Sequence, residues 1–458
     1  MMKRRQFLSH SCRLGVASAT LGSSLLQLGL SRQAVSQTDD YKALVCVLLA
    51  GGNDSYNMLV PDDADTYGAY ADIRSDLALA RESLLPLDGT DTQGRRYGLH
   101  PGMPGLQGLF AGGNAALLQS VGTLLEPMDT NALQAGSAPL PLGLFSHADQ
   151  IQQWQTAISD ARVADGWGGR IADILEEGNP ANGISMNVSL AGNNVFQSGK
   201  LSSPYSISTA GNGAPALNGY NASGPGGANF QQIVDRMLEQ DAEHLFRREY
   251  AQRLRGALDS QQVFSAALES SGDLPTIFSD VPFSSALRQV ARVINARDAL
   301  GATRQTFFIT VGGWDHHDDV LENQAAMLPA IDTGLLEFHN AIEALGLGLQ
   351  VTTFTISDFG RTLTSNGQGS DHGWGGHHII LGGAVNGGQF YGEYPDIHPD
   401  NPLDVGRGIY APTTPVDAYF GELALWFGVS GGDLASILPN ASRFYTPQTN
   451  GRPIGFMS

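Results

Sequence analysis

The sequence predicts an α/β fold in which a mostly parallel sheet carries helices on both faces. Three continuous apolar runs, at 41–50, 306–311 and 351–356, each lead into a turn that contains glycine or aspartate. Apolar runs of this length are typical of strands buried on both faces, as in parallel sheets. Amphipathic segments follow the strands, and this succession of strand, helix and strand indicates an α/β layer architecture.

The remaining elements are predicted from the same patterns. A strand is predicted at 115–121 and another at 378–383, with helices at 151–158, from about 174 onward, within 230–300, at 322–346 and at 415–428. Residues 179–229 are rich in Gly, Asn and Ser, and this stretch is longer than an ordinary loop inside a domain. We therefore predict one domain over 37–458, with an irregular and helical insertion at about 179–300.

The first 36 residues have the composition of an export signal. They combine a basic start, a weakly apolar middle and an Ala-Val-Ser end. The string Lys-Arg-Arg-Gln-Phe-Leu at 3–8 resembles a twin-arginine signal, and an ordinary secretory signal is the alternative. We expect the twin-arginine export machinery as a partner and a periplasmic or secreted location. No later segment offers the roughly 20 apolar residues of a membrane helix, so no membrane span is predicted in the mature chain.

Charge and cysteine content narrow the classes of partner. Residues 1–36 contain five basic residues and no acidic one, so their removal takes the formal net charge from −19 to −24. Such an acidic chain disfavours nucleic acid and anionic lipid as the main partner. Cys12 belongs to the signal and Cys46 stands alone in an apolar run, which excludes an internal disulfide and a thiolate metal site.

Aspartates and histidines follow the predicted strands at the points where the strands end. The candidate metal ligands are Asp54, Asp315, His317, Asp358, Asp371, His372, His377 and His378. Ligands in open α/β sheets bind outside the carboxyl ends of the strands, so these side chains are expected to converge. Imidazole nitrogens together with carboxylates suit transition metals better than calcium. We therefore predict a divalent metal centre that holds one or two ions, Zn or Mn.

Two further residues are candidates for catalysis. Ser146 precedes the helix predicted at 151–158, where its hydroxyl is either a metal-activated nucleophile or a plain helix cap. Arg361 follows the strand at 351–356, and its guanidinium is expected to hold a small anionic substrate through two hydrogen bonds. Two adjacent ions would stabilise the attacking and the leaving oxygen in phosphoryl or sulfuryl transfer.

Longer strings of the mature chain carry a family resemblance. These strings are LLAGGNDSYNMLVP, VGGWDHH, SDFGRT, DHGWGGHHIILGG and GRGIYAPTTPVDAYFGELALWFGV. On these strings the chain resembles the exported bacterial family catalogued as domain of unknown function 1501, thought to share the alkaline phosphatase and sulfatase fold. The resemblance implies that Asp54, Asp315 and His317 are metal ligands.

The resemblance also implies metal ligands after the strand predicted at 351–356. It implies Asp358 as a further ligand, with His372, His377 or His378 as the last one. The alternative Asp-His pair is Asp371-His372, but no predicted strand leads directly into it. Phe359 stands where enzymes of that superfamily usually have His. The resemblance therefore leaves open two ions or one ion with a modified second site.

Three hypotheses of function follow. The first is an exported metal-dependent hydrolase of phosphate or sulfate esters, in which a hydroxyl or water attacks. The second is a non-catalytic exported protein that binds a metal or ligand on the same fold. The third, a serine hydrolase using Ser55 or Ser146, is disfavoured because neither serine lies in a G-x-S-x-G elbow.

Overall fold

The computed structural model describes residues 41–175, 184–211, 213–214, 217, 219–220, 224–239, 244–398, 400–446 and 451–458. Residues 42–458 form one compact unit by their internal contacts. The predicted export signal, 1–36, lies outside the described residues, so it stays a prediction. None of the described helices combines the length and the apolar composition that crossing a lipid bilayer requires.

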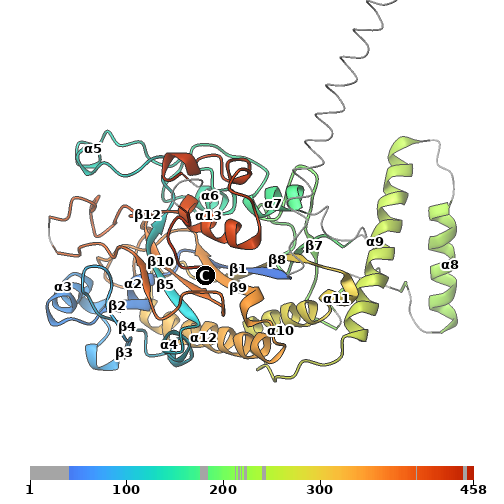
Figure 1. Ribbon diagram of the computed structural model, residues 1–458, viewed down its shortest axis with the longest axis horizontal. Helices are drawn as coiled ribbons and strands as arrows, with labels where there is room; N and C mark the ends of the chain where they lie inside the picture. The colour runs from blue at the N-terminus through green and yellow to red at the C-terminus, as the bar shows by residue number, and fades with distance from the viewer. Residues whose placement is uncertain are drawn as a thin grey trace, which may run out of the picture. The chain divides into compact units, whose positions relative to one another are not determined.

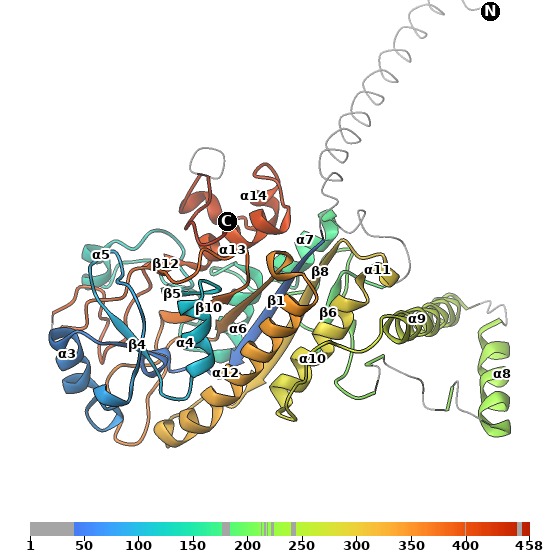
Figure 2. The same cartoon turned by 60° about the horizontal axis from the view of Figure 1, so that its bottom comes forward.

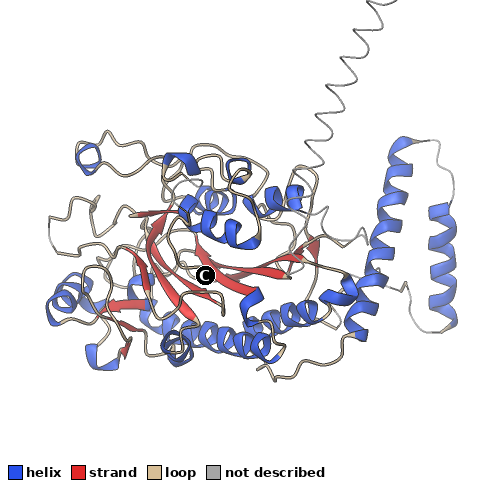
Figure 3. Ribbon diagram, viewed as in Figure 1, coloured by secondary structure: helices blue, strands red, loops and turns tan. Residues whose placement is uncertain are grey.

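A large sheet forms the centre of this unit, and its strands run in the order β11-β5-β10-β9-β1-β8-β6-β7, with β12 beside β5 (Figure 3). The strands are β1 (Lys42–Ala50), β5 (Ala115–Gly122), β6 (Asn187–Ser189), β7 (Tyr205–Ser206), β8 (Arg304–Gly312), β9 (Val351–Ser357), β10 (Gly376–Leu381), β11 (Phe390–Gly392) and β12 (Thr414–Pro415). Strand β1 lies between β8 and β9 and pairs with both in parallel. Its seven central residues are buried, as its apolar sequence requires.

Among the described strands of this sheet, β10 is the one that runs against its neighbours β9 and β5. The other described pairings in the sheet are parallel. The amino end of β10 therefore lies at the same edge as the carboxyl ends of β1, β8 and β9. The loop from 358 to 375 leaves β9 and enters β10 at that edge, which is where polar strand-end residues gather.

Helices cover both faces of the sheet, so the predicted α/β fold is confirmed (Figures 1 and 2). One face carries α4 (Pro104–Ala111), α10 (Pro282–Asn295) and α12 (Val320–Ala344), and the other carries α6 (His147–Thr156), α7 (Trp167–Leu175), α13 (Val416–Phe427) and α14 (Leu434–Ile437). The remaining helices are α2 (Ser55–Met58), α3 (Ala64–Arg74), α5 (Thr130–Gln134), α8 (Pro225–Glu239), α9 (Leu245–Ser270) and α11 (Arg297–Leu300).

Two local features differ from the sequence prediction. A small antiparallel sheet of β2 (Leu59–Pro61), β4 (Tyr97–Leu99) and β3 (Leu85–Pro86) was not predicted, because its strands are too short to show a pattern. Helix α7 begins at Trp167, several residues before the predicted start near 174. Its early glycines are there for packing, since a Cβ on Gly168 would lie 2.7 Å from the Phe196 ring.

Asp417, in the first turn of α13, predicts a pH dependence of stability. Its carboxylate is buried, and neither oxygen has a hydrogen-bond partner among the described residues. Burial raises the pKa of Asp417 to about 7. The unfolded chain releases this proton near pH 4, so the free energy of unfolding falls as pH rises from about 4 to about 7, by up to about 4 kcal/mol.

Replacement of Asp417 by asparagine removes this titration. We expect the Asp417→Asn variant to unfold at a higher denaturant concentration than the parent protein at pH 8, and the difference to shrink towards pH 4. Denaturant melts at several pH values measure it, with the exposed Asp76→Asn as the matched control. Parallel stability curves for Asp417→Asn and the parent protein across this range would contradict the prediction.

Candidate metal centre

A Gly-Gly turn after β1 brings the ends of β1, β8 and β9 together. Gly51 and Gly52 have φ values of +120° and +84°, which favour glycine. A Cβ on Gly51 would lie 2.5 Å from the backbone nitrogen of Asp315, and one on Gly52 would lie 2.6 Å from the ring of Phe359. The absence of side chains at this turn therefore allows the segments after β8 and β9 to approach it closely.

Three histidines converge on the carboxylate of Asp315 at this edge. The Nε2 atom of His317 lies 3.1 Å from Oδ1 of Asp315, and the Nε2 atom of His372 lies 3.4 Å from the same oxygen. His147, the first residue of α6, places its Nε2 atom 3.5 Å from Oδ2 of Asp315. The Nε2 atoms of His317 and His372 are 3.0 Å apart. We call these four residues the His-Asp cluster.

Each histidine of the cluster is held through its other ring nitrogen. Nδ1 of His147 lies 2.7 Å from Oδ2 of Asp358, and Nδ1 of His317 lies 2.9 Å from Oδ1 of Asp371. Nδ1 of His372 lies 2.8 Å from the backbone carbonyl of Phe145. An oxygen acceptor facing each Nδ1 requires that atom to donate, so in the neutral rings the three Nε2 atoms present lone pairs. Among these four residues the facing atoms are thus all acceptors, and the Arg361 guanidinium from outside the cluster donates to Oδ1 of Asp315.

The spacing of these acceptors fits a metal ion. Ligand atoms about 2.0–2.1 Å from a tetrahedral zinc ion lie about 3.3 Å from one another. The separations of 3.0 to 3.5 Å within the His-Asp cluster bracket this value. His147, Asp315 and His372 together satisfy the mutual distances of a metal site. Histidines oriented through Nδ1 by carboxylate or carbonyl oxygens are the usual arrangement around protein-bound metals.

Hydrogen bonds lower the pKa of two carboxylates of the site, Asp315 and Asp371. Burial raises the pKa of Asp315, but the hydrogen bond and charge of Arg361 outweigh it, so its pKa lies below the ordinary value. Burial also acts upward on Asp371, where hydrogen bonds, beginning with that from Asn366 and including that of Arg407, bring the pKa to about 2. Ionised carboxylates are the form that binds cations.

The remaining groups of the site are more deeply buried. Burial raises the pKa of Asp358, whose Oδ1 accepts a hydrogen bond of 3.0 Å from the Gly51 backbone. Burial lowers the pKa of His372, which favours its neutral, ligating form. The rings of His147 and His372 both lie against Phe359, at 4.9 and 4.6 Å between centroids. Phe359 therefore forms an apolar wall, while the side chains of Asp315 and His317 are 46% and 45% exposed.

Asp54 follows β1 as predicted, but its carboxylate contacts a different partner. Oδ2 of Asp54 lies 2.6 Å from a guanidinium nitrogen of Arg74 and accepts a 2.8 Å hydrogen bond from the Ser370 hydroxyl. Both members of the Asp54–Arg74 pair are completely buried. The described contacts do not join Asp54 to the His-Asp cluster.

The two residues predicted as catalytic both adjoin the His-Asp cluster. Ser146 precedes His147 in the chain, and Arg361 contacts Asp315. Ser146 caps α6, where its hydroxyl accepts the backbone N–H of Asp149 at 3.5 Å. Arg361 is buried and donates to Asp315. Its guanidinium also donates to the backbone carbonyls of Gly51, Gly52, Trp314 and Ser370.

His377 and His378 lie in β10 and are buried away from these contacts. His377 stacks on Tyr394 at 4.6 Å between centroids, while His378 lies 4.8 Å from the Trp154 ring. Burial lowers the pKa of each to about 3. The described contacts of their rings include none with the His-Asp cluster.

His147 belongs to the cluster although the sequence reasoning did not select it as a ligand. The sequence pattern singles out its neighbour Ser146, as a nucleophile or a helix cap. The signal that could have found it is a histidine at the first position of a helix, directly after the Ser146 cap. Its partner Asp358 is 211 residues away, so no local spacing links the two.

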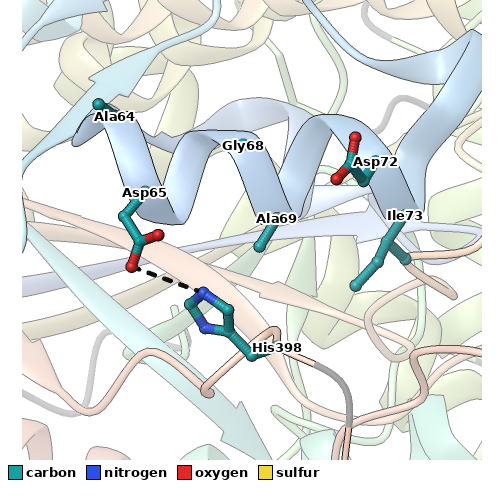
Figure 4. Close-up of a pocket in the computed structure, with 7 residues that line it drawn as sticks. All are labelled: Ala64, Asp65, Gly68, Ala69, Asp72, Ile73 and His398. Atoms are coloured by element: carbon teal, nitrogen blue, oxygen red, sulfur yellow. Dashed lines mark ion pairs between the residues drawn. The ribbon is translucent and has the colours of Figure 1, made fainter.

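A hollow of about 350 Å³ lies beside α3, and none of the predicted site residues lines it. Figure 4 shows Asp65 of α3 directed towards the ring of His398, with Ala69 and Ile73 pointing to the same side of the helix. His398 lies 3.7 Å from Asp65 and 2.8 Å from Asp396, so its ring is paired within the chain. This hollow has no convergent set of ligand atoms comparable to the His-Asp cluster.

Fold and site together define a mixed α/β protein with a solvent-reached cluster of three histidines and an aspartate at its strand ends. The chain belongs to the family described as protein of unknown function (DUF1501), whose profile matches residues 41–407. The resemblance inferred from the sequence strings is thus confirmed. No curated protein sequence matches the chain.

Two solved structures are similar to this chain at low sequence identity. One is Ps i-CgsB in complex with k-i-k-neocarrahexaose, with 10% identity, a TM-score of 0.34, and coverage of 89% of this chain and 78% of the other. The other is the PsFucS1 sulfatase from Pseudoalteromonas sp., with 12% identity, a TM-score of 0.34, and coverage of 90% and 72%.

Proposed function

We propose that the protein is an exported metal-dependent hydrolase of phosphate or sulfate esters. The observation that carries this proposal is that the Nε2 atoms of His147, His317 and His372 each lie 3.1 to 3.5 Å from a carboxylate oxygen of Asp315. The class of ester rests on the resemblance to the alkaline phosphatase and sulfatase superfamily carried by the strand-end strings.

The residues that would hold the metal are those of the His-Asp cluster, His147, Asp315, His317 and His372. Three neutral imidazoles and one carboxylate suit a single Zn or Mn ion. When bound, such an ion supplies positive charge that stabilises developing negative charge on oxygen and activates water near neutral pH. The exposed sides of Asp315 and His317 leave this centre open to a substrate. This ligand set replaces the longer one predicted from the sequence.

Other residues of the chain orient the ligands. Asp358 and Asp371 hold the Nδ1–H groups of His147 and His317, and each fixes the direction of a ring. Because all the described contacts of the Arg361 guanidinium are internal, we assign it to holding Asp315 and the Gly-Gly turn, in place of the predicted substrate clamp. Arg407, half exposed and 2.6 Å from Asp371, is the cation we propose to meet an anionic substrate.

The attacking oxygen in this proposal comes from water or from the Ser146 hydroxyl. Ser146 is only partly buried and immediately precedes His147, and its hydroxyl proton is free to be donated while its oxygen caps the helix. A Ser146→Ala variant separates the two routes. Loss of turnover with intact metal content assigns the nucleophile to Ser146, whereas retained turnover assigns it to water.

The test is turnover by the purified protein loaded with Zn or Mn. Aryl phosphates, phosphodiesters and aryl sulfates are offered in parallel, before and after treatment with a chelator. We expect hydrolysis of at least one class, abolished by the chelator and restored by metal. A fully loaded protein that hydrolyses none of these esters would overturn the proposal.

A non-catalytic metal-binding function is the alternative. The specific observation in its favour is that the His-Asp cluster offers four protein side chains, the number of protein ligands that is typical of structural tetrahedral sites. The internal use of the Arg361 guanidinium points the same way. Full metal content and metal-dependent stability without ester turnover would support this alternative.

A further inference from the structure

Helices α8 and α9 form a hairpin with a small core of its own. Val234 of α8 and Leu258 of α9 are buried together with Tyr220. Asp235 joins the parts, since it accepts hydrogen bonds of 2.8 Å from both the Tyr220 hydroxyl and the Arg255 guanidinium. The two helices lie side by side in Figures 1 and 2. The apolar residues of this core account for one side of α8 only.

A second set of large apolar side chains on the hairpin is exposed. It consists of Phe230, Ile233 and Met237 on α8 and Leu245, Phe246 and Tyr250 on α9. The three on α8 follow at intervals of three and four residues and so share one face. The last three are 70%, 76% and 68% exposed, and they occupy the first two turns of α9. We call these six residues the hairpin patch.

The apolar face of α8 is wider than the part of it that α9 covers. Val234 and Leu238 meet α9, whereas Phe230, Ile233 and Met237 lie on the adjoining face and remain exposed. A helix with an apolar face this wide is typical of a position between two neighbours rather than at a surface. Monomeric soluble proteins rarely expose contiguous apolar patches of more than a few hundred Å².

The size of the patch matches one side of a stable protein interface. Since a fully exposed aromatic side chain presents about 150–250 Å², the exposed fractions of the six residues correspond to roughly 700 Å² per chain. A standard stable interface buries about 800 Å² on each partner. The patch alone therefore supplies most of the surface that such an interface needs.

We propose that the hairpin patch binds the same patch on a second copy of this chain. Two hairpins related by a twofold axis would form a four-helix bundle, with the six exposed residues of each copy in its core. In such an isologous contact one patch serves both partners, so no additional complementary surface is needed. Helical hairpins that pack in antiparallel pairs are the usual components of such bundles.

Charge favours a second copy over an anionic lipid surface. The whole chain carries a formal charge of −19, which opposes approach to anionic headgroups. Helices α8 and α9 together contain five arginines and five acidic residues, so they do not share this excess of negative charge. Two hairpins of mixed charge can therefore meet with less repulsion than other surfaces of the same protein.

Sedimentation and light scattering of the purified protein test the proposal. We expect a mass about twice that of the monomer at micromolar concentrations. Phe246→Lys and Tyr250→Lys should each weaken the dimer, raising its dissociation constant about 30-fold or more if each aromatic is an anchor of the interface. Leu201→Lys and Ile277→Lys are the matched controls, because these exposed apolar residues lie outside the patch and should leave the dimer intact.

Other outcomes overturn the proposal. A parent protein that stays monomeric at 100 micromolar excludes it, as does a dimer that persists unchanged in the Phe246→Lys/Tyr250→Lys double variant. Co-sedimentation of a monomeric parent protein with phosphatidylglycerol vesicles, lost in the double variant, would assign the patch to a lipid surface instead. Circular dichroism of the variants confirms that the fold is retained.

Discussion

Replacement of His147 by alanine is expected to leave the purified protein without a bound metal ion. His147 contributes one of the four converging ligand atoms, and its loss leaves two histidines and Asp315 around an incomplete site. The metal-to-protein ratio, measured by mass spectrometry, should fall from about one to less than about a tenth. The gain in stability on adding metal, about 4 kcal/mol at a thousandfold excess over the dissociation constant, should also disappear.

Two further variants test whether this loss of metal is specific to the ligand. Asp358→Asn keeps the His147 ring but weakens the bond that orients it, and should lower metal affinity by about 10–100-fold. His398→Ala is the matched control, because that histidine is exposed and pairs with Asp396 outside the cluster. If the His147→Ala protein retains its metal with unchanged affinity, His147 is not a ligand and the proposed set is wrong.

Replacement of Asp54 by asparagine is expected to destabilise the protein by about 3–5 kcal/mol while its metal content stays unchanged. The completely buried guanidinium of Arg74 would lose the charge that compensates its own. It would keep its hydrogen bonds to Asn57 and to the carbonyls of Thr362 and Leu363, which cannot neutralise it. Denaturant unfolding and metal analysis of the same preparation measure both parts of the prediction.

The surface pair Arg81–Asp62 provides the matched control for Asp54. Its side chains are partly exposed and 2.9 Å apart, and Asp62→Asn should cost less than about 1 kcal/mol. The two roles of Asp54 predict opposite outcomes. If Asp54→Asn folds with near-normal stability and loses its metal, Asp54 is a ligand, as the sequence resemblance implied.

The central sheet could be predicted because its strands are continuous apolar runs. At β1, β8 and β9 the sequence shows both the strand and the polar turn that ends it. The small sheet β2-β4-β3 gave no such signal, since its strands have three residues or fewer. Nor could the sequence indicate that β10 runs against its neighbours, because direction depends on how the chain is connected in space.

The candidate site was accessible to sequence reasoning only in part. Asp315, His317 and His372 were selected because polar residues after parallel strands share one edge of the sheet. The density of histidines from 372 to 378 does not imply convergence, because His377 and His378 are successive strand residues that point to opposite faces. The ion pair of Asp54 with Arg74 depends on packing between segments, which no spacing in the sequence reveals.

The side chains of the His-Asp cluster come from α6, from the turn after β8 and from the loop before β10. This origin limits the stage of folding at which the cluster could bind a metal. Such a site has no local precursor, because the two parallel pairings of β1 must form before the ligands meet. Contacts between distant parts of the chain form late and slowly in folding. An ion held by this cluster would therefore bind after the sheet is complete. The compartment in which folding finishes then decides which metal the protein first encounters.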